Sequence, residues 1–129
     1  MNDRESEADP EAASERAREF REQRELLNKI VLDNSGLTMK RFFNLDTQAY
    51  TDGALSTKTK ELLGLVSSLV LRCDDCTMYH LLRCFEKGVS DQEFEETMSI
   101  GLVVGGSITI PHIRRAFKAW VELRRGKGE

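Results

Sequence analysis

Two cysteines in the middle of the chain, Cys73 and Cys76, have the spacing of a reactive thiol pair. His80 follows the second cysteine at i+4, and Cys84 lies one turn further on. A helix that began near Cys73 would carry all four side chains on one face. A Cys-x-x-Cys motif in a chain without a secretory signal indicates redox or metal chemistry.

A dithiol redox pair is the first interpretation. One thiol must ionise to attack an oxidant, and a helix N-terminus favours the thiolate through its partial positive charge and free N–H groups. At this spacing the other sulfur can attack the resulting sulfenic acid and close a disulfide. His80, one turn beyond Cys76, is placed to take the proton. The charges of Asp74 and Asp75 act against a thiolate.

A zinc site and simple packing are the alternatives. Cys73 and Cys84 would lie about 16 Å apart along one helix, whereas zinc–ligand bonds are about 2.3 Å long. Two or three of these residues could bind zinc only with ligands from elsewhere. Cysteine is also often a small buried hydrophobic residue, and we expect this of Cys84. Spacing alone favours redox chemistry for the pair with His80 and leaves metal and structural roles open.

Composition bounds the class of protein. The chain has 129 residues, a hydrophobic fraction of 40%, a charged fraction of 32% and a formal charge of −3. These values predict one globular domain and give no electrostatic reason to expect nucleic acid as a partner. The acidic segment 1–10 has the features of neither a signal nor a transit peptide, and the apolar runs are too short to span a membrane. We therefore expect a cytoplasmic protein, where cysteines stay reduced unless they turn over.

The elements before the cysteines are predicted to be a tail and two helices. Residues 1–15 are expected to be a mobile tail, and residues 16–37 an N-terminal helix that makes an oligomer contact through a thin apolar stripe. The stripe consists of Phe20, Leu27, Ile30 and Val31. Asn34-Ser35-Gly36 should end this helix, with Gly36 in the left-handed conformation. A short helix over about 39–51 follows.

The cysteines are predicted to follow a central apolar helix. Ser56 or Thr57 should cap that helix, and residues 62–71 are apolar almost all round, which is typical of a central position. The cysteine helix should run to about Lys87, with Gly88 as its C′ residue.

Two more helices complete the prediction. Ser90 and Glu93 form a capping box for the first, which Gly105-Gly106 should end. Thr109 is expected to cap the last helix, with Pro111 in its first turn. We find no convincing strand, repeat or Gly-rich phosphate loop, so the chain is predicted to be all-α, and we expect no cofactor.

Glu61 lies twelve residues before Cys73, at the start of the central apolar helix. On spacing alone, a solvated first-turn acid beside Lys60 is the simpler interpretation. In an antiparallel pair of helices, Glu61 would face the later turns of the cysteine helix. It would reach the thiols only if the helices crossed or met at an angle.

Glu61, Cys73-x-x-Cys76 and His80 together resemble the motif of the alkylhydroperoxidase D-like branch of the carboxymuconolactone decarboxylase family. The resemblance covers roughly residues 42–120 and implies that residues 38–125 form a domain of this family. It implies an alkylhydroperoxidase D-like, all-α fold with a central antiparallel helical hairpin. It also implies assembly into homotrimers or homohexamers.

The same resemblance implies a thiol-dependent peroxidase or disulfide reductase. Cys76 would be the nucleophile toward a hydroperoxide substrate and Cys73 would resolve the product, while Glu61 and His80 would relay the proton with a water. In the better-known members the electron donor is a dihydrolipoyl group on a partner protein; another thiol donor would serve the same chemistry.

One residue departs from the pattern of the resemblance. The best-known peroxidase members carry a histidine just before the second cysteine, and this chain has Asp75. His112 could replace that group, although we expect a capping or surface role for it. The alternative function is a non-catalytic oligomeric binding module in which the cysteines are structural or hold a metal.

Overall fold

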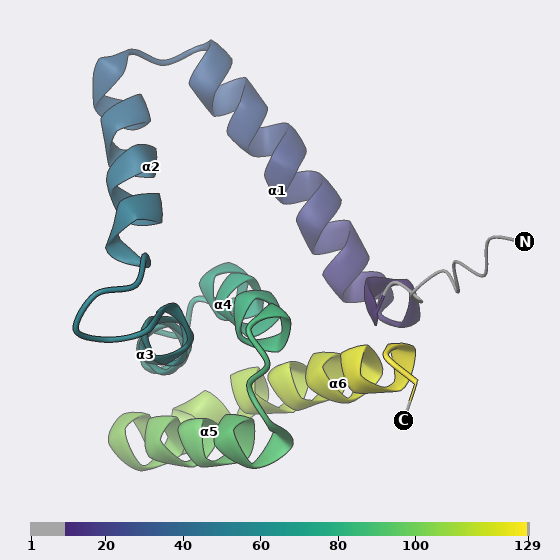
Figure 1. Cartoon of the computed structure of the whole chain (residues 1–129). Helices are drawn as coiled ribbons and strands as arrows, with labels where there is room; N and C mark the ends of the chain where they lie inside the picture. Colours follow the sequence, from purple (N-terminus) through teal and green to yellow (C-terminus); the bar gives the residue numbers. More distant parts are fainter. Residues whose placement is uncertain (1–9, 129) are drawn as a thin grey trace, which may run out of the picture.

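Every regular element in the described part of the chain, residues 10–128 of a computed structural model, is a helix (Figure 1). This agrees with the predicted all-α class. In order along the chain the elements are η1 (Pro10–Ala13), α1 (Glu15–Asp33), α2 (Leu37–Ala49), α3 (Thr57–Val70), α4 (Asp74–Glu86), α5 (Asp91–Gly105), η2 (Ser107–Thr109) and α6 (Ile110–Gly126), where η denotes a short 3-10 helix.

Helices α3 and α4 form an antiparallel hairpin at the centre of the fold. Only residues 71–73 join them, and Glu61 near the start of α3 lies against Arg83 near the end of α4. Ser56 is the N-cap of α3, and its hydroxyl accepts a hydrogen bond from the Thr59 N–H, as the sequence predicts. The hairpin therefore places the early turns of α3 against the later turns of α4.

The buried core lies between this hairpin and the pair α5 and α6. Phe94 of α5 and Trp120 of α6 are stacked with ring centroids 4.4 Å apart. Asp91 accepts a 2.8 Å hydrogen bond from the Trp120 indole N–H, which satisfies the polar end of this buried ring. Other fully or nearly fully buried side chains of the core are Leu65, Leu69, Met78, Leu81, Leu82, Cys84, Met98 and Leu123.

The N-terminal helices α1 and α2 differ in how closely they pack against the rest of the fold. The Ser14 side chain caps α1 and is fully buried together with Ala17, where η1 packs against α6. Residues 10–15 are thus folded rather than a tail, while residues 1–9 lie outside the described residues. Helix α2 has no buried residue, and it reaches away from the hairpin beside the far end of α1 (Figure 1).

Two predicted helix ends differ in detail. The Asn34 side chain and N–H both bind the Ile30 carbonyl and close α1, so Gly36 needs no left-handed conformation and has φ −94° as the N-cap of α2. Thr109 makes no side-chain cap for α6; its hydroxyl instead donates to the Gly106 carbonyl inside η2. The capping box of Ser90 and Glu93 forms as predicted.

None of the helices in the described part of the chain is both long and apolar enough to cross a membrane.

Candidate active site

Cys73 and Cys76 form a disulfide at the N-terminus of α4, with their Cα atoms 5.3 Å apart. Helix α4 begins at Asp74 and Cys73 is its N-cap, so the Cys73 sulfur accepts a 3.3 Å hydrogen bond from the Cys76 N–H. Cys76 is exposed and Cys73 half-buried. The pair therefore occupies the helix end where free N–H groups and the helix dipole favour a thiolate.

The turn before the pair has an unusual backbone. Arg72 adopts φ 57°, a left-handed conformation that costs an L-residue about 1–2 kcal/mol. Its N–H binds the Leu69 carbonyl and the Cys73 N–H binds the Ser68 carbonyl. These two hydrogen bonds are those of a Schellman motif, which ends α3. The motif reverses the chain within three residues and delivers Cys73 directly to the start of α4.

A buried carboxylate orients His80. The Glu61 Oε2 and His80 Nδ1 atoms are 2.8 Å apart, and Glu61 is only 1% exposed. With Nδ1–H donated to the carboxylate, the lone pair of His80 is on Nε2. The Tyr50 hydroxyl lies 3.4 Å from Nε2. Arg83 approaches the other oxygen of Glu61 at 3.4 Å.

Gly64 makes room for the imidazole. A Cβ atom at this position would lie 2.7 Å from the Cε1 atom of His80, closer than real contacts allow. The histidine ring can therefore lie directly on the backbone of α3. This contact, together with the bond to Glu61, fixes both the position and the tautomer of the ring.

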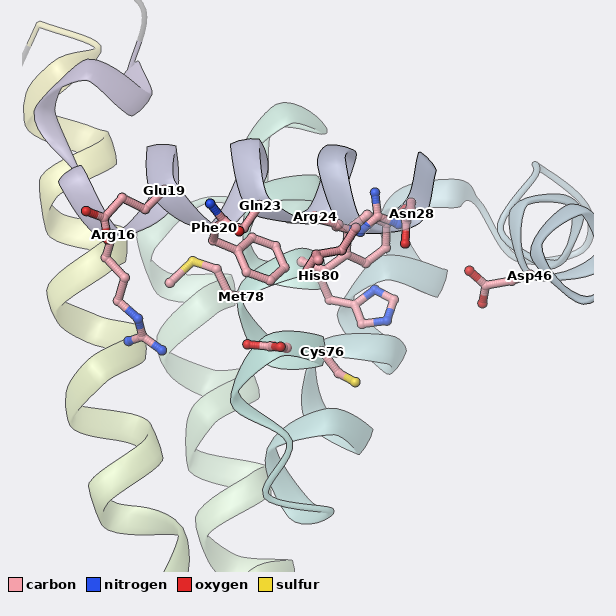
Figure 2. A pocket seen from close by; sticks show the side chains of 13 residues that line it. Arg16, Glu19, Phe20, Gln23, Arg24, Asn28, Asp46, Cys76, Met78 and His80 are labelled. Atoms are coloured by element: carbon pink, nitrogen blue, oxygen red, sulfur yellow. The ribbon is translucent and has the colours of Figure 1, made fainter. Parts of the chain in front are cut away.

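Cys76 and His80 open onto the same cavity, which has a volume of about 610 Å³ and lies between α1 and α4. Figure 2 shows the Cys76 sulfur and the His80 ring on the same side of α4, with α1 passing over the cavity. The wall is mixed in character: Phe20, Leu27, Met78 and Tyr79 contribute apolar surface, and Arg16, Glu19, Gln23, Arg24, Asn28, Asp46 and Asp75 contribute polar groups. A small molecule in this cavity would reach the second cysteine and the histidine together.

Cys84 and His112 do not line the cavity beside Cys76. Cys84 lies in the core with no exposed surface, and burial, followed by the negative charge of Glu61, raises the pKa of its thiol to about 12. This confirms the expectation that Cys84 is a buried packing residue, whereas Cys76 is exposed near the start of the same helix. His112 is half-buried and bonded to Asp74 at 2.7 Å, so it neither caps α6 nor lines the cavity beside Cys76.

Among residues 10–128, no group of three His, Cys, Asp or Glu side chains is arranged to hold a metal ion.

Sequence reasoning missed three contributions to the site. The spacing of the motif residues points to neither Tyr50, whose hydroxyl lies 3.4 Å from His80, nor Gly64, on which the imidazole packs. Arg115, which holds Asp74 at 2.9 Å, gave no signal. Glycine at a helix crossing is the one sequence signal that could have located the imidazole.

Comparison with known proteins identifies the class. Residues 36–119 match the model of the carboxymuconolactone decarboxylase family, and the chain belongs to this family. One curated relative, an uncharacterized protein from Cupriavidus necator, is 26% identical over 68 residues; these are 53% of this chain and 60% of the relative, so the match spans less than two thirds of that protein.

Solved structures share this fold. Two crystal structures of a Thermotoga maritima protein are 57% and 55% identical to the chain, with TM-scores of 0.81 and 0.80. Each covers 83% of this chain, and 94% and 91% of the Thermotoga chains. The second is described as a carboxymuconolactone decarboxylase family protein for which involvement in an antioxidative response is suggested. A family protein from Legionella pneumophila in its apo form, 24% identical with a TM-score of 0.70 over 88% of this chain and 97% of its own, has the same fold.

Proposed function

We propose that the chain is a thiol-dependent peroxidase or disulfide reductase. The observation that carries this proposal is the Cys73–Cys76 disulfide at a helix N-terminus, with Cys76 opening onto the same cavity as a histidine that a buried carboxylate orients. An antioxidative response, suggested for the Thermotoga relative, is the setting in which such chemistry is used.

The proposed cycle begins with both cysteines reduced. Nε2 of His80 takes the proton of the Cys76 thiol, and the thiolate attacks one oxygen of a hydroperoxide. The O–O bond breaks, the alcohol leaves with the proton, and Cys76 becomes a sulfenic acid. The Cys73 thiol attacks that sulfur, water leaves, and the disulfide forms. A dihydrolipoyl group or another dithiol donor then supplies two electrons and two protons and restores both thiols.

Each supporting residue has a physical reason for its role. Glu61 balances the positive charge that His80 acquires when it takes the proton, because the two groups are in hydrogen-bond contact in a buried place. The N–H groups at the start of α4 stabilise the thiolate. Asp75 also lines the cavity, and a negative charge there opposes the thiolate, which would slow attack on a peroxide and on a disulfide alike.

The first test is steady-state turnover with dihydrolipoamide as reductant and either tert-butyl hydroperoxide or oxidised glutathione as oxidant. Cys76→Ser should abolish turnover of both oxidants, and Cys84→Ala, the matched control on the same helix, should retain it. Cys73→Ser should accumulate a sulfenic acid on Cys76, detected by dimedone labelling and mass spectrometry. Unchanged turnover in Cys76→Ser would contradict the assignment.

The alternative is a non-catalytic oligomeric binding module. It predicts no turnover in either assay, together with stoichiometric zinc by elemental analysis or a co-purifying small molecule. The described residues hold no three-ligand cluster of the kind that a zinc site needs, so we favour the enzymatic function.

We also propose that the chain assembles into a homotrimer or homohexamer through its N-terminal helices. Apolar side chains of α1 and α2 are exposed although they would be expected to be covered: Leu26, Leu27, Ile30, Val31, Leu37, Met39, Phe42 and Leu45. Light scattering should give three or six times the mass of the 14.7 kDa chain; a monomer would contradict this. The cytoplasm, predicted from the sequence, is where thiol donors would maintain such a cycle.

A further inference from the structure

A cluster of charged side chains outside the cavity lies next to the disulfide. Asp74 is the first residue of α4 and directly follows Cys73. Its Oδ1 atom is 2.7 Å from Nδ1 of His112, and its Oδ2 atom is 2.9 Å from Nη2 of Arg115. Both partners come from the first turns of α6, so the start of the last helix is tied to the start of the cysteine helix.

The proposed cycle gives this cluster no role. An uncompensated carboxylate beside Cys73 would disfavour a thiolate there, because like charges repel. Arg115 carries a permanent positive charge, and a protonated His112 would add another. The small cleft beside Asp74 and His112 is also lined by Arg16 of α1.

We propose that Arg115 and His112 are positioning residues that neutralise Asp74 and thereby set the reduction potential of the Cys73–Cys76 pair. Cations that compensate Asp74 stabilise the thiolate of the reduced protein and make the disulfide a stronger oxidant. This inference rests on the proposed function only in taking the pair as redox-active.

Two observations favour this over a purely structural salt bridge. Burial acts to raise the pKa of Asp74, but the hydrogen bond from His112 and the charge of Arg115 outweigh it and hold that pKa below its usual value. The carboxylate is thus ionised whenever the pair is in use. In contrast, Asp75 makes no ion pair with the described residues, so only one of the two neighbouring charges is compensated.

The test is the equilibrium between the Cys73–Cys76 disulfide and dithiothreitol in the full-length protein. The disulfide takes two electrons and two protons from dithiothreitol, which becomes its cyclic disulfide. Arg115→Gln should leave Asp74 less compensated and shift the equilibrium toward the protein disulfide by about three- to tenfold. A tenfold shift corresponds to about 30 mV. Asp74→Asn should shift it the opposite way, toward the reduced protein.

Three further variants separate charge from structure. Arg115→Lys keeps the charge and should restore most of the wild-type equilibrium. Arg114→Gln removes a neighbouring exposed charge of α6 that makes no contact with Asp74, and it should change the disulfide equilibrium little. The double variant Asp74→Asn with Arg115→Gln should return close to wild type, because both charges are gone. If the ion pair were only a structural link, its loss would shift the disulfide equilibrium in the same direction in Asp74→Asn and in Arg115→Gln.

Shifts of equal sign in those two variants, or no shift in either, would overturn the inference. The measurement uses no peroxide, so it gives a result even if the protein lacks peroxidase activity. A native disulfide that dithiothreitol does not reduce at all would overturn the redox role itself, and with it the proposed function.

Discussion

The two ends of α4 carry cysteine in opposite circumstances. At its N-terminus, Cys73 and Cys76 meet free N–H groups and an open cavity, with His80 one turn away. Two turns later, Cys84 is enclosed in the core, and burial raises its pKa to about 12. One helix thus holds a reactive pair and an inert thiol, which shows that the position on the helix, more than the residue type, decides what a cysteine can do.

The largest difference between the two ends should appear in alkylation rates. Burial raises the pKa of Cys84 from 9.0 to about 12. At any pH below 9.0, Cys84 therefore has about a thousandfold less thiolate than an ordinary cysteine. After reduction of the native protein, iodoacetamide at pH 8 should therefore modify Cys73 and Cys76 and leave Cys84 intact, as measured by peptide mass spectrometry. The same protein in guanidinium chloride should be modified at all three. Equal alkylation rates of all three cysteines in the native protein would contradict the difference in reactivity between the two ends of α4.

A second contrast compares Glu61 and Glu86, two acids that both bind Arg83. Glu61 faces His80 and Arg83, whereas Glu86, at the C-terminal end of α4, binds only arginines. Glu61→Gln should lower kcat/KM by about a hundredfold, in the range that a general acid–base partner contributes, and shift the activity to higher pH. Without the carboxylate, the charge that His80 acquires is unbalanced, so thiolate forms only at higher pH.

Glu86→Gln is the control for this experiment. It also removes a carboxylate from Arg83, through a 2.7 Å contact that is half-exposed and so of small energetic value. Its pH–rate profile should match that of the wild type. A profile unchanged in both variants would take Glu61 out of the mechanism.

Local signals explain why much of this arrangement could be predicted. The caps at Ser56 and Ser90 and the left-handed Gly88 depend on residues within one turn of each other. The all-α class and the start of the cysteine helix follow from such signals and from apolar periodicity. The pairing of Glu61 with His80 was expected only from the family resemblance, since nothing in the spacing of the two residues distinguishes a buried carboxylate from a solvated one.

Long-range geometry explains what was missed. Cys76 and Cys84 lie about two turns apart on one helix, and the exposure of the first and the full burial of the second are set by the elements packed around α4 rather than by their spacing. The bond between Asp74 and His112 joins residues 38 positions apart. It exists because α6 passes beside the start of α4, and no local pattern records that crossing.

Two glycines at helix contacts give a further contrast, Gly64 where α3 meets His80 of α4 and Gly101 where α5 meets α3. A Cβ on Gly64 would lie 2.7 Å from the His80 ring, and one on Gly101 would lie 2.5 Å from the Leu69 side chain in the core. Each alanine substitution should cost about 1–3 kcal/mol through overpacking, partly offset by about 1 kcal/mol of helix propensity. Urea unfolding should thus give similar losses of stability.

Activity should separate these two variants. Gly64→Ala must displace the imidazole, and a misplacement of about 1 Å can cost up to about a hundredfold in rate, so turnover should fall by about tenfold or more. Gly101→Ala disturbs only core packing and should retain turnover once its stability is allowed for. Equal activity of the two variants would mean that the position of His80 does not matter.

The smallest effect concerns the turns that flank α4. Both have the hydrogen bonds of a Schellman motif, but the left-handed residue is Arg72 before the helix, at φ 57°, and Gly88 after it, at φ 77°. Gly88→Ala should destabilise the protein by about 1 kcal/mol, because alanine resists this conformation.

Arg72→Gly should have the opposite effect and raise stability by up to about 1 kcal/mol, because the relief of the left-handed strain exceeds the entropy that glycine adds to the unfolded chain. Urea midpoints at one fixed protein concentration test both changes, since assembly would otherwise shift them. A loss of stability in Arg72→Gly would mean that the arginine side chain itself stabilises the turn. The strained backbone before Cys73 would then be maintained by its side-chain contacts, and the two ends of α4 would differ in how their turns are held as well as in their thiols.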